Sequence, residues 1–252
     1  MKYLLSLLIV ILFTGCVPQK ESVQTFFQTD SATTIKKDYA FAIKSLKTLK
    51  TKLDKRNPKA FDKTLVKSMN TLIDNLDNTL HLKFQGRTID NYKDYLQLAF
   101  SKDSIKNRND YFTLGLYYLI YDAYDIKEGH QVTALSYSTE KLEKLYKNLQ
   151  IIKWKIKYAK NINDNYLFLT WQNNWQIELK KRIKKGYEPS WKELQQLEYI
   201  KNGKESFFVA SNFSFEVLLT QMTDRVANTL QLLGITPQEM SLEALKAIFI
   251  FI

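Results

Sequence analysis

Apolar residues recur at the spacing of an α-helix along most of this 252-residue chain. In the first such stripe they are separated alternately by four and three residues, which places them on one side of a helix. Its members are Ile35, Tyr39, Ala42, Leu46, Leu49 and Leu53. Similar stripes follow almost to the C-terminus, and only seven glycines and four prolines interrupt them. The pattern predicts an all-α protein, an irregular helical bundle of about eight or nine helices, in which residues 31–252 form a single domain.

Capping and turn residues between the stripes set the expected helix boundaries. Asn57-Pro58 is typical of a helix start, and Ser190 with Glu193 has the spacing of a capping box. The expected helices cover residues 31–53, 58–86, 88–99, 110–126, 133–160, 164–185, 190–200, 211–233 and 241–252.

The segment 152–158 can be interpreted in two ways. Its residues alternate between apolar and polar, which is a strand signal. However, a helical stripe from Leu142 to Ala159 runs through the same residues, and no turn residue divides it. We therefore expect one long helix here.

The N-terminus has the organisation of an export signal. Met1-Lys2 is followed by an apolar run from Tyr3 to Phe13, and then by Thr14-Gly15-Cys16. The ending Phe13-Thr14-Gly15-Cys16 resembles the lipobox of bacterial lipoproteins, although that family usually has Leu in place of Phe13. The resemblance implies that residues 1–15 are a removable signal peptide and that the membrane anchor is acylated Cys16.

The same resemblance bears on location and on the next segment. Lipoproteins kept in the inner membrane commonly have Asp after the cysteine, and this chain has Val17. The expected location is therefore the outer membrane, facing the periplasm. Residues 16–30 are polar and rich in Gln, and we expect a flexible tether there.

The charge and the cysteine count limit the classes of partner. The formal net charge is +11, and Cys16 is the only cysteine, so the domain has no disulfide. A basic surface can bind anionic headgroups, but abundant Lys, Asn, Ile and Tyr are also typical of an AT-rich genome. The cations within 180–185 either end a solvated helix or contact anionic headgroups beside the anchor. Nucleic acid is not an expected partner of an exported lipoprotein.

The sequence offers little catalytic chemistry. His81 and His130 lie 49 positions apart, without the spacing of metal ligands, and no metal or cofactor is expected. Glu205-Ser206 resembles the Glu-Ser start of the catalytic motif in lytic transglycosylases, and by that resemblance Glu205 would be the acid/base. The rest of that motif has no counterpart, and Glu205 is equally explained as a helix-start residue. We expect no enzyme.

Two aromatic groups are candidates for ligand binding. Tyr117, Tyr121 and Tyr124 recur on one helix face, with Asp122 nearby, and phenols with carboxylates can line a groove. In the second group, Trp171, Asn174 and Trp175 lie within five residues, and tryptophans with amides suit a carbohydrate face. Both groups are also compatible with helix packing, and that alternative stays open.

These observations favour a non-catalytic scaffold or accessory subunit of an envelope complex, bound to an envelope protein of unknown identity. The alternative is a lipoprotein that binds a glycan, peptide or lipid fragment. A weaker alternative is a peptidoglycan-cleaving enzyme. The apolar residues 248–252 either pack into the core or enter a groove of the partner.

Overall fold

The computed structural model describes residues 20–75, 78–126, 136–170, 172–207, 213–241 and 244. The protein is an all-α helical bundle, as the sequence predicts. Among the described residues, the only strands are β1 (Lys83–Phe84) and β2 (Arg87–Thr88), which form a small antiparallel hairpin.

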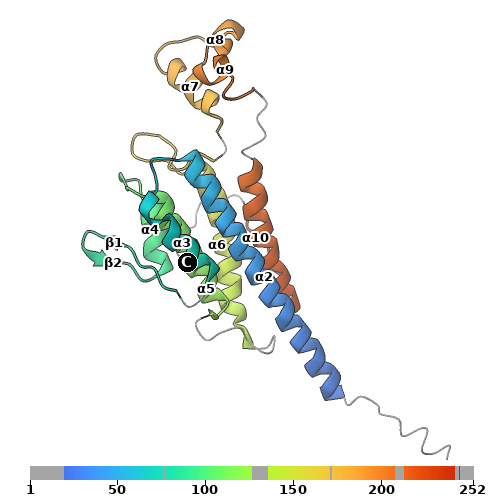
Figure 1. Ribbon diagram of the computed structural model, residues 1–252. Helices are drawn as coiled ribbons and strands as arrows, with labels where there is room; N and C mark the ends of the chain where they lie inside the picture. The colour runs from blue at the N-terminus through green and yellow to red at the C-terminus, as the bar shows by residue number, and fades with distance from the viewer. Residues whose placement is uncertain are drawn as a thin grey trace, which may run out of the picture.

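Four long helices make the body of the bundle (Figure 1). They are α2 (Lys20–Arg56), α5 (Arg108–Ala123), α6 (Thr139–Tyr158) and α10 (Phe213–Leu232). Helix α10 packs against α2 and α6, and α5 packs against the same two helices. Helix α3 (Val66–Asp74) lies on α2, and α4 (Tyr92–Phe100) lies on α5.

Helix α2 confirms the first stripe. All six members of the stripe are buried, because α5 and α10 cover that side of the helix. The helix already begins at Lys20, so residues 20–30 of the expected tether are helical. Gln, Lys and Glu are good helix formers, and no proline follows Pro18 in this segment.

The expected helix 58–86 is wrong at both ends, because residues 57–62 form turns and bends rather than a helix start, and the helix ends at Asp74. A 3-10 turn (Lys63–Leu65) leads into α3, which ends at Asp74, and residues 78–82 then run into the hairpin. The Tyr95 hydroxyl accepts a hydrogen bond from Leu82 N (2.8 Å) and donates one to Ile89 O (3.0 Å). The Tyr118 hydroxyl donates to Leu80 O at 2.8 Å. These long-range bonds satisfy an extended backbone that the apolar period alone assigns to a helix.

Helices α4 and α5 are unusually close together. A Cβ atom added at Gly115 of α5 would lie 2.7 Å from Leu96 Cγ of α4. The buried Arg108 guanidinium donates to the carbonyls of Ala99 (2.7 Å) and Asp103 (2.7 Å), at and beyond the end of α4. The cap of α4 is Asn91, whose side chain accepts from Asp94 N, so the helix expected at 88–99 begins only at Tyr92.

Helix α6 resolves the ambiguity at residues 152–158 in favour of a helix. The expected helix 164–185 is shorter than predicted, because only α7 (Asn174–Ile183) forms. Leu169 N donates to Asn57 Oδ1 (2.9 Å), and Phe168 packs between Phe100 and Phe112. Residues before α7 therefore fill the core as irregular chain.

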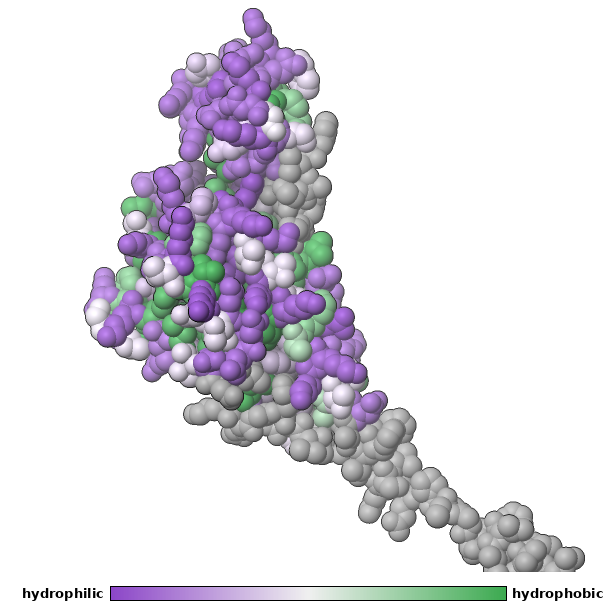
Figure 2. Space-filling model, viewed as in Figure 1, coloured by the Kyte–Doolittle hydropathy of each residue, from purple (hydrophilic) through white to green (hydrophobic). Residues whose placement is uncertain are grey.

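Helix α7 and the residues after it form a small unit beyond the C-terminal end of α2 (Figure 1). This α7–α9 unit, residues 174–207, contains α8 (Trp191–Gln195) and α9 (Glu198–Lys201). Ser190 caps α8 by accepting from Glu193 N, as its spacing predicts. In Figure 2, hydrophilic side chains cover most of the visible face of this unit and of the bundle.

The last expected helix, residues 241–252, lies outside the described residues except for Ser241 and Ala244. The same is true of the apolar C-terminal run, the signal peptide, Cys16 and His130. No helix within the described ranges is long and apolar enough to cross a bilayer.

Candidate ligand pocket

A cavity of about 520 Å³ opens beside α5, and we call it the tyrosine pocket. Its walls come from the segment before β1, the start of α4, one side of α5 and the first turn of α6. It is lined by Asn78, Thr79, His81, Asp90, Asn91, Tyr92, Tyr117, Tyr118, Tyr121, Asp122, Asp125 and Lys141.

Three candidates from the sequence, Tyr117, Tyr121 and Asp122, lie in the wall of this pocket. Tyr124 does not, although it shares their periodicity. It is fully buried, its hydroxyl lies 3.2 Å from Thr229 Oγ1 on α10, and its ring meets the Tyr39 ring edge-on. Helix α5 ends at Ala123, and there α2 and α10 cover its final tyrosine. Tyr124 is therefore a core residue.

The tryptophan and amide candidates are not part of the pocket. Asn174 Nδ2 donates to Glu205 Oε1 (2.6 Å), and Trp175 N donates to Glu205 Oε2 (3.1 Å). The Trp175 ring packs edge-on against Phe207. Both residues hold the α7–α9 unit together, and Trp171 lies outside the described residues. The two aromatic groups of the sequence are thus not combined in one site.

The tyrosine rings are held in place by contacts within the protein. Tyr118 stacks between His81, at 5.2 Å, and Tyr95, at 5.8 Å. Tyr117 stacks on Tyr121, with ring centroids 5.9 Å apart. These contacts fix the back of the pocket before any ligand is present.

The hydroxyl of Tyr117 is the most unusual polar group of the pocket. The residue is only 1% exposed, and its hydroxyl has no hydrogen-bond partner among the described residues. Burial, with Tyr118 and Tyr121 nearby, raises the pKa of Tyr117. A buried hydroxyl without a partner costs about 1–3 kcal/mol, so such groups call for an explanation.

The charge of the pocket is opposite to that of the whole chain. Three carboxylates line it, those of Asp90, Asp122 and Asp125, against one lysine. Lys141 Nζ donates a hydrogen bond to Asp125 and lies 3.9 Å from Asp122. The pocket is therefore acidic in a chain of net charge +11.

The buried tyrosines predict how stability changes at high pH. Burial is the main cause that raises the pKa of Tyr39, Tyr95, Tyr117 and Tyr124. Because the folded pKa lies above the unfolded value of about 10, their contribution to stability is complete below that pH and is lost as the pH rises.

We therefore expect these four tyrosines to ionise only together with unfolding. The measurement is a titration that follows tyrosinate absorbance and far-ultraviolet circular dichroism in parallel, with the urea-unfolded chain as control. Complete tyrosine ionisation while the helical signal persists would contradict the expectation.

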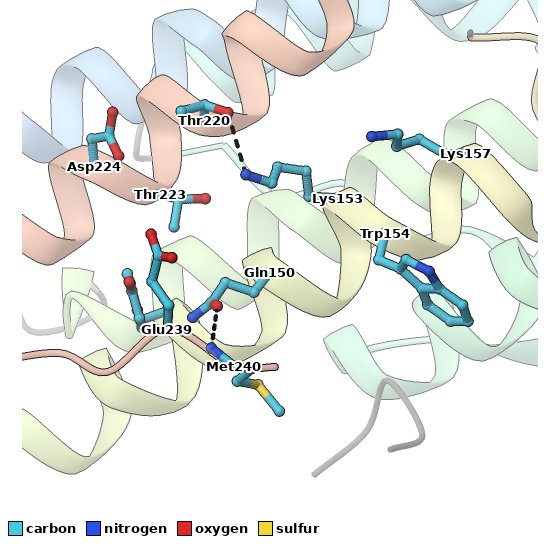
Figure 3. A pocket seen from close by; sticks show the side chains of 10 residues that line it. Gln150, Lys153, Trp154, Lys157, Thr220, Thr223, Asp224, Glu239 and Met240 are labelled. Atoms are coloured by element: carbon cyan, nitrogen blue, oxygen red, sulfur yellow. Dashed lines mark hydrogen bonds between the residues drawn. The ribbon is translucent and has the colours of Figure 1, made fainter. Parts of the chain in front are cut away.

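A second cavity, of about 260 Å³, lies between α6 and α10 (Figure 3). Gln150 Oε1 accepts a hydrogen bond from Met240 N (2.8 Å), which attaches the chain after α10 to α6. Lys153 and Lys157 both pair with Glu216, at 3.5 and 3.2 Å. In Figure 3, Trp154 points away from the acidic side chains of Asp224 and Glu239. This cavity lies at the contact between two helices of the bundle, and its two lysines share one carboxylate as ion-pair partner.

Glu205 has a structural position in the α7–α9 unit. Both of its carboxylate oxygens accept hydrogen bonds at the start of α7, and Arg56 Nη1 lies 3.2 Å from Oε1. No group of three or more His, Cys, Asp or Glu within the described ranges could hold a metal ion.

The pocket residues that the sequence did not indicate come from outside α5. Tyr92, His81, Asp90 and Lys141 are brought to Tyr117 by the hairpin segment, α4 and α6. Comparison with known family models, characterised proteins and solved structures gave no match, so the function of this chain must be inferred from its own residues.

Proposed function

We propose that this chain is a lipid-anchored protein of the bacterial envelope that binds a small ligand in the tyrosine pocket. The observation that carries the proposal is the pocket itself, a cavity of about 520 Å³ whose wall combines four tyrosines with three aspartates and one lysine. Aromatic rings with a few polar groups are typical of the wall of a small-molecule site.

The dimensions and lining of the pocket support this function. Small-molecule sites usually have volumes of about 300–1,000 Å³ and combine aromatic walls with a few polar groups. The tyrosine pocket, at about 520 Å³, has four tyrosines and a few charged side chains. Its walls are fixed by bonds such as that from the Tyr118 hydroxyl to Leu80 O, so little ordering would be needed on binding.

The anchor is proposed from the sequence alone. Cys16 would carry acyl chains after removal of residues 1–15, and Val17 favours the outer membrane, with the domain facing the periplasm. Intact-mass analysis of protein extracted from its own membranes tests this step, with Cys16→Ser as the control. An unmodified Cys16 in the wild type would contradict it.

The binding function is tested by recovery of the natural ligand. Full-length protein is purified from its own membranes and unfolded, and the released small molecules are identified by mass spectrometry. The comparison variant is Thr79→Trp, which places a large ring at an exposed position in the pocket wall. Thr71→Trp, at an exposed position of α3, is the matched control.

We expect one compound to be released by the wild type and by Thr71→Trp, and to be absent from Thr79→Trp. Release of the same compounds in equal amounts from all three proteins would contradict a ligand site in this pocket. So would the absence of any released compound from the wild type.

A scaffold or accessory subunit is the second candidate, because the α7–α9 unit exposes large apolar side chains. Ile183, Tyr187 and Trp191 are all exposed there, and Trp191 is 66% exposed. Such groups often mark contact with another protein. A stoichiometric partner recovered with the lipidated wild type, and lost with Trp191→Ser, would support this candidate.

A further inference from the structure

The acidic groups of the tyrosine pocket are only partly neutralised within the protein. Lys141 donates its hydrogen bond to Asp125, and its 3.9 Å distance to Asp122 is too long for a second one. Asp90 accepts only from Asn91 Nδ2 (3.3 Å). Among the described residues, Asp90 and Asp122 therefore have no cationic hydrogen-bond donor.

Two tyrosine rings are available beside these carboxylates. Both faces of Tyr118 are covered by His81 and Tyr95, and one face of Tyr121 is covered by Tyr117. Tyr92 has no ring partner in the part of the chain that the structure describes, and it is half-buried. The charge of Asp122 contributes, after burial, to a raised pKa of Tyr92, which places the phenol and the carboxylate near each other.

Carboxylates beside open tyrosine faces favour one class of ligand. A cation is attracted to the negative face of an aromatic ring and to a carboxylate at once. A neutral sugar would gain no attraction from the charges of Asp90 and Asp122, which are exposed and solvated by water, and an anion would be repelled by them.

We propose that the tyrosine pocket selects an organic cation, a ligand that carries a compact alkylated ammonium group. The ammonium lies among Tyr92, Tyr121 and Asp122, and the remainder of the ligand extends along the rest of the pocket wall. This inference depends on the proposed binding function and adds the charge of the ligand to it.

The test uses two probes of nearly equal shape that differ in charge. Choline carries a trimethylammonium group, and 3,3-dimethyl-1-butanol has a neutral tert-butyl group in its place. Each is titrated calorimetrically into the full-length protein in maltoside micelles, which contain no choline headgroup. We expect choline to bind about tenfold more tightly than the neutral alcohol.

Three substitutions then locate the effect. Asp122→Asn is expected to weaken choline binding by about fivefold and to leave binding of the alcohol unchanged. Asp224→Asn makes the same change of charge in the second cavity and is expected to change neither. Thr79→Trp is expected to abolish binding of choline.

Three results would overturn the inference. They are equal affinity for the two probes, no detectable choline binding, and choline binding that Thr79→Trp or Asp122→Asn leaves intact. None of these results would contradict the proposed binding function if the wild type still releases a compound that is absent from Thr79→Trp. Loss of the binding function itself is shown only by the extraction experiment.

Discussion

Replacing Lys50 with Met is expected to lower the free energy of unfolding by about 3–5 kcal/mol, because it leaves buried carboxylates without their cation. Lys50 is 3% exposed, and its Nζ lies 2.5 Å from Asp54 Oδ2 and 3.3 Å from Asp110 Oδ1. The Asp110 side chain is completely buried, and its other oxygen accepts from Asp62 N at 2.7 Å. Burial raises the pKa of Asp110, which shows how poorly this site is solvated.

The measurement is urea unfolding followed by circular dichroism, and Lys47→Met is the matched control. Lys47 lies on the same helix as Lys50 and pairs with Asp74 of α3, but both of these side chains are exposed. We expect that substitution to cost at most about 1 kcal/mol. An equal loss of unfolding free energy in the two lysine variants would show that the buried cluster contributes no more to stability than an exposed ion pair does.

Replacing Glu205 with Ala is expected to open the α7–α9 unit while the four-helix body stays folded. Glu205 joins Arg56 at the end of α2 to Asn174 and to the backbone of Trp175 in α7. Hydrogen bonds to a charged group contribute about 1.5–3 kcal/mol each, so the loss should be large for so small a unit. The effect stays local because these bonds fix only the start of α7.

Hydrogen exchange resolved by residue measures this result. Amides of α7 should exchange faster in Glu205→Ala, and those of α5 and α10 should be unchanged. Glu198→Ala is the control, since Glu198 is exposed and pairs with Lys204 on the surface. Accelerated exchange throughout the bundle would contradict a local role. Glycan cleavage that Glu205→Gln abolishes would instead revive the enzymatic alternative.

The parts of the fold that were predictable are those decided by local periodicity. The stripe of α2 and the long helix through residues 152–158 follow from apolar spacing, and both are confirmed. The wrong helix ends occur where side chains distant in sequence satisfy the backbone. Tyr95 and Tyr118 bond the extended segment before β1, and Asn57 bonds the irregular chain at Leu169. Spacing within a segment carries no information on such bonds.

The candidate site was predictable to the same extent. Tyr117, Tyr121 and Asp122 share one helix, so their proximity could be derived from the sequence. Tyr92, His81 and Lys141 reach the pocket through the packing of other elements. Tyr124 was assigned to the pocket by periodicity, but it lies where α10 covers the end of α5. Periodicity within α5 does not indicate which of its residues another helix will cover.

The early start of α2 has a mechanical consequence for a protein anchored at Cys16. Only three residues, 17–19, separate Cys16 from the start of α2 at Lys20, so little chain lies between the proposed anchor and the helix. The 37 residues of α2 form one rod of about 55 Å, which resists bending far more than a coil does. Tyr39, which packs on Tyr124 near the end of α5, lies about 30 Å along this rod. On the lipoprotein proposal, this rigid helix keeps the pocket about 30 Å along α2 from the end nearest the anchor, so the distance between anchor and pocket does not vary as it would with a coil.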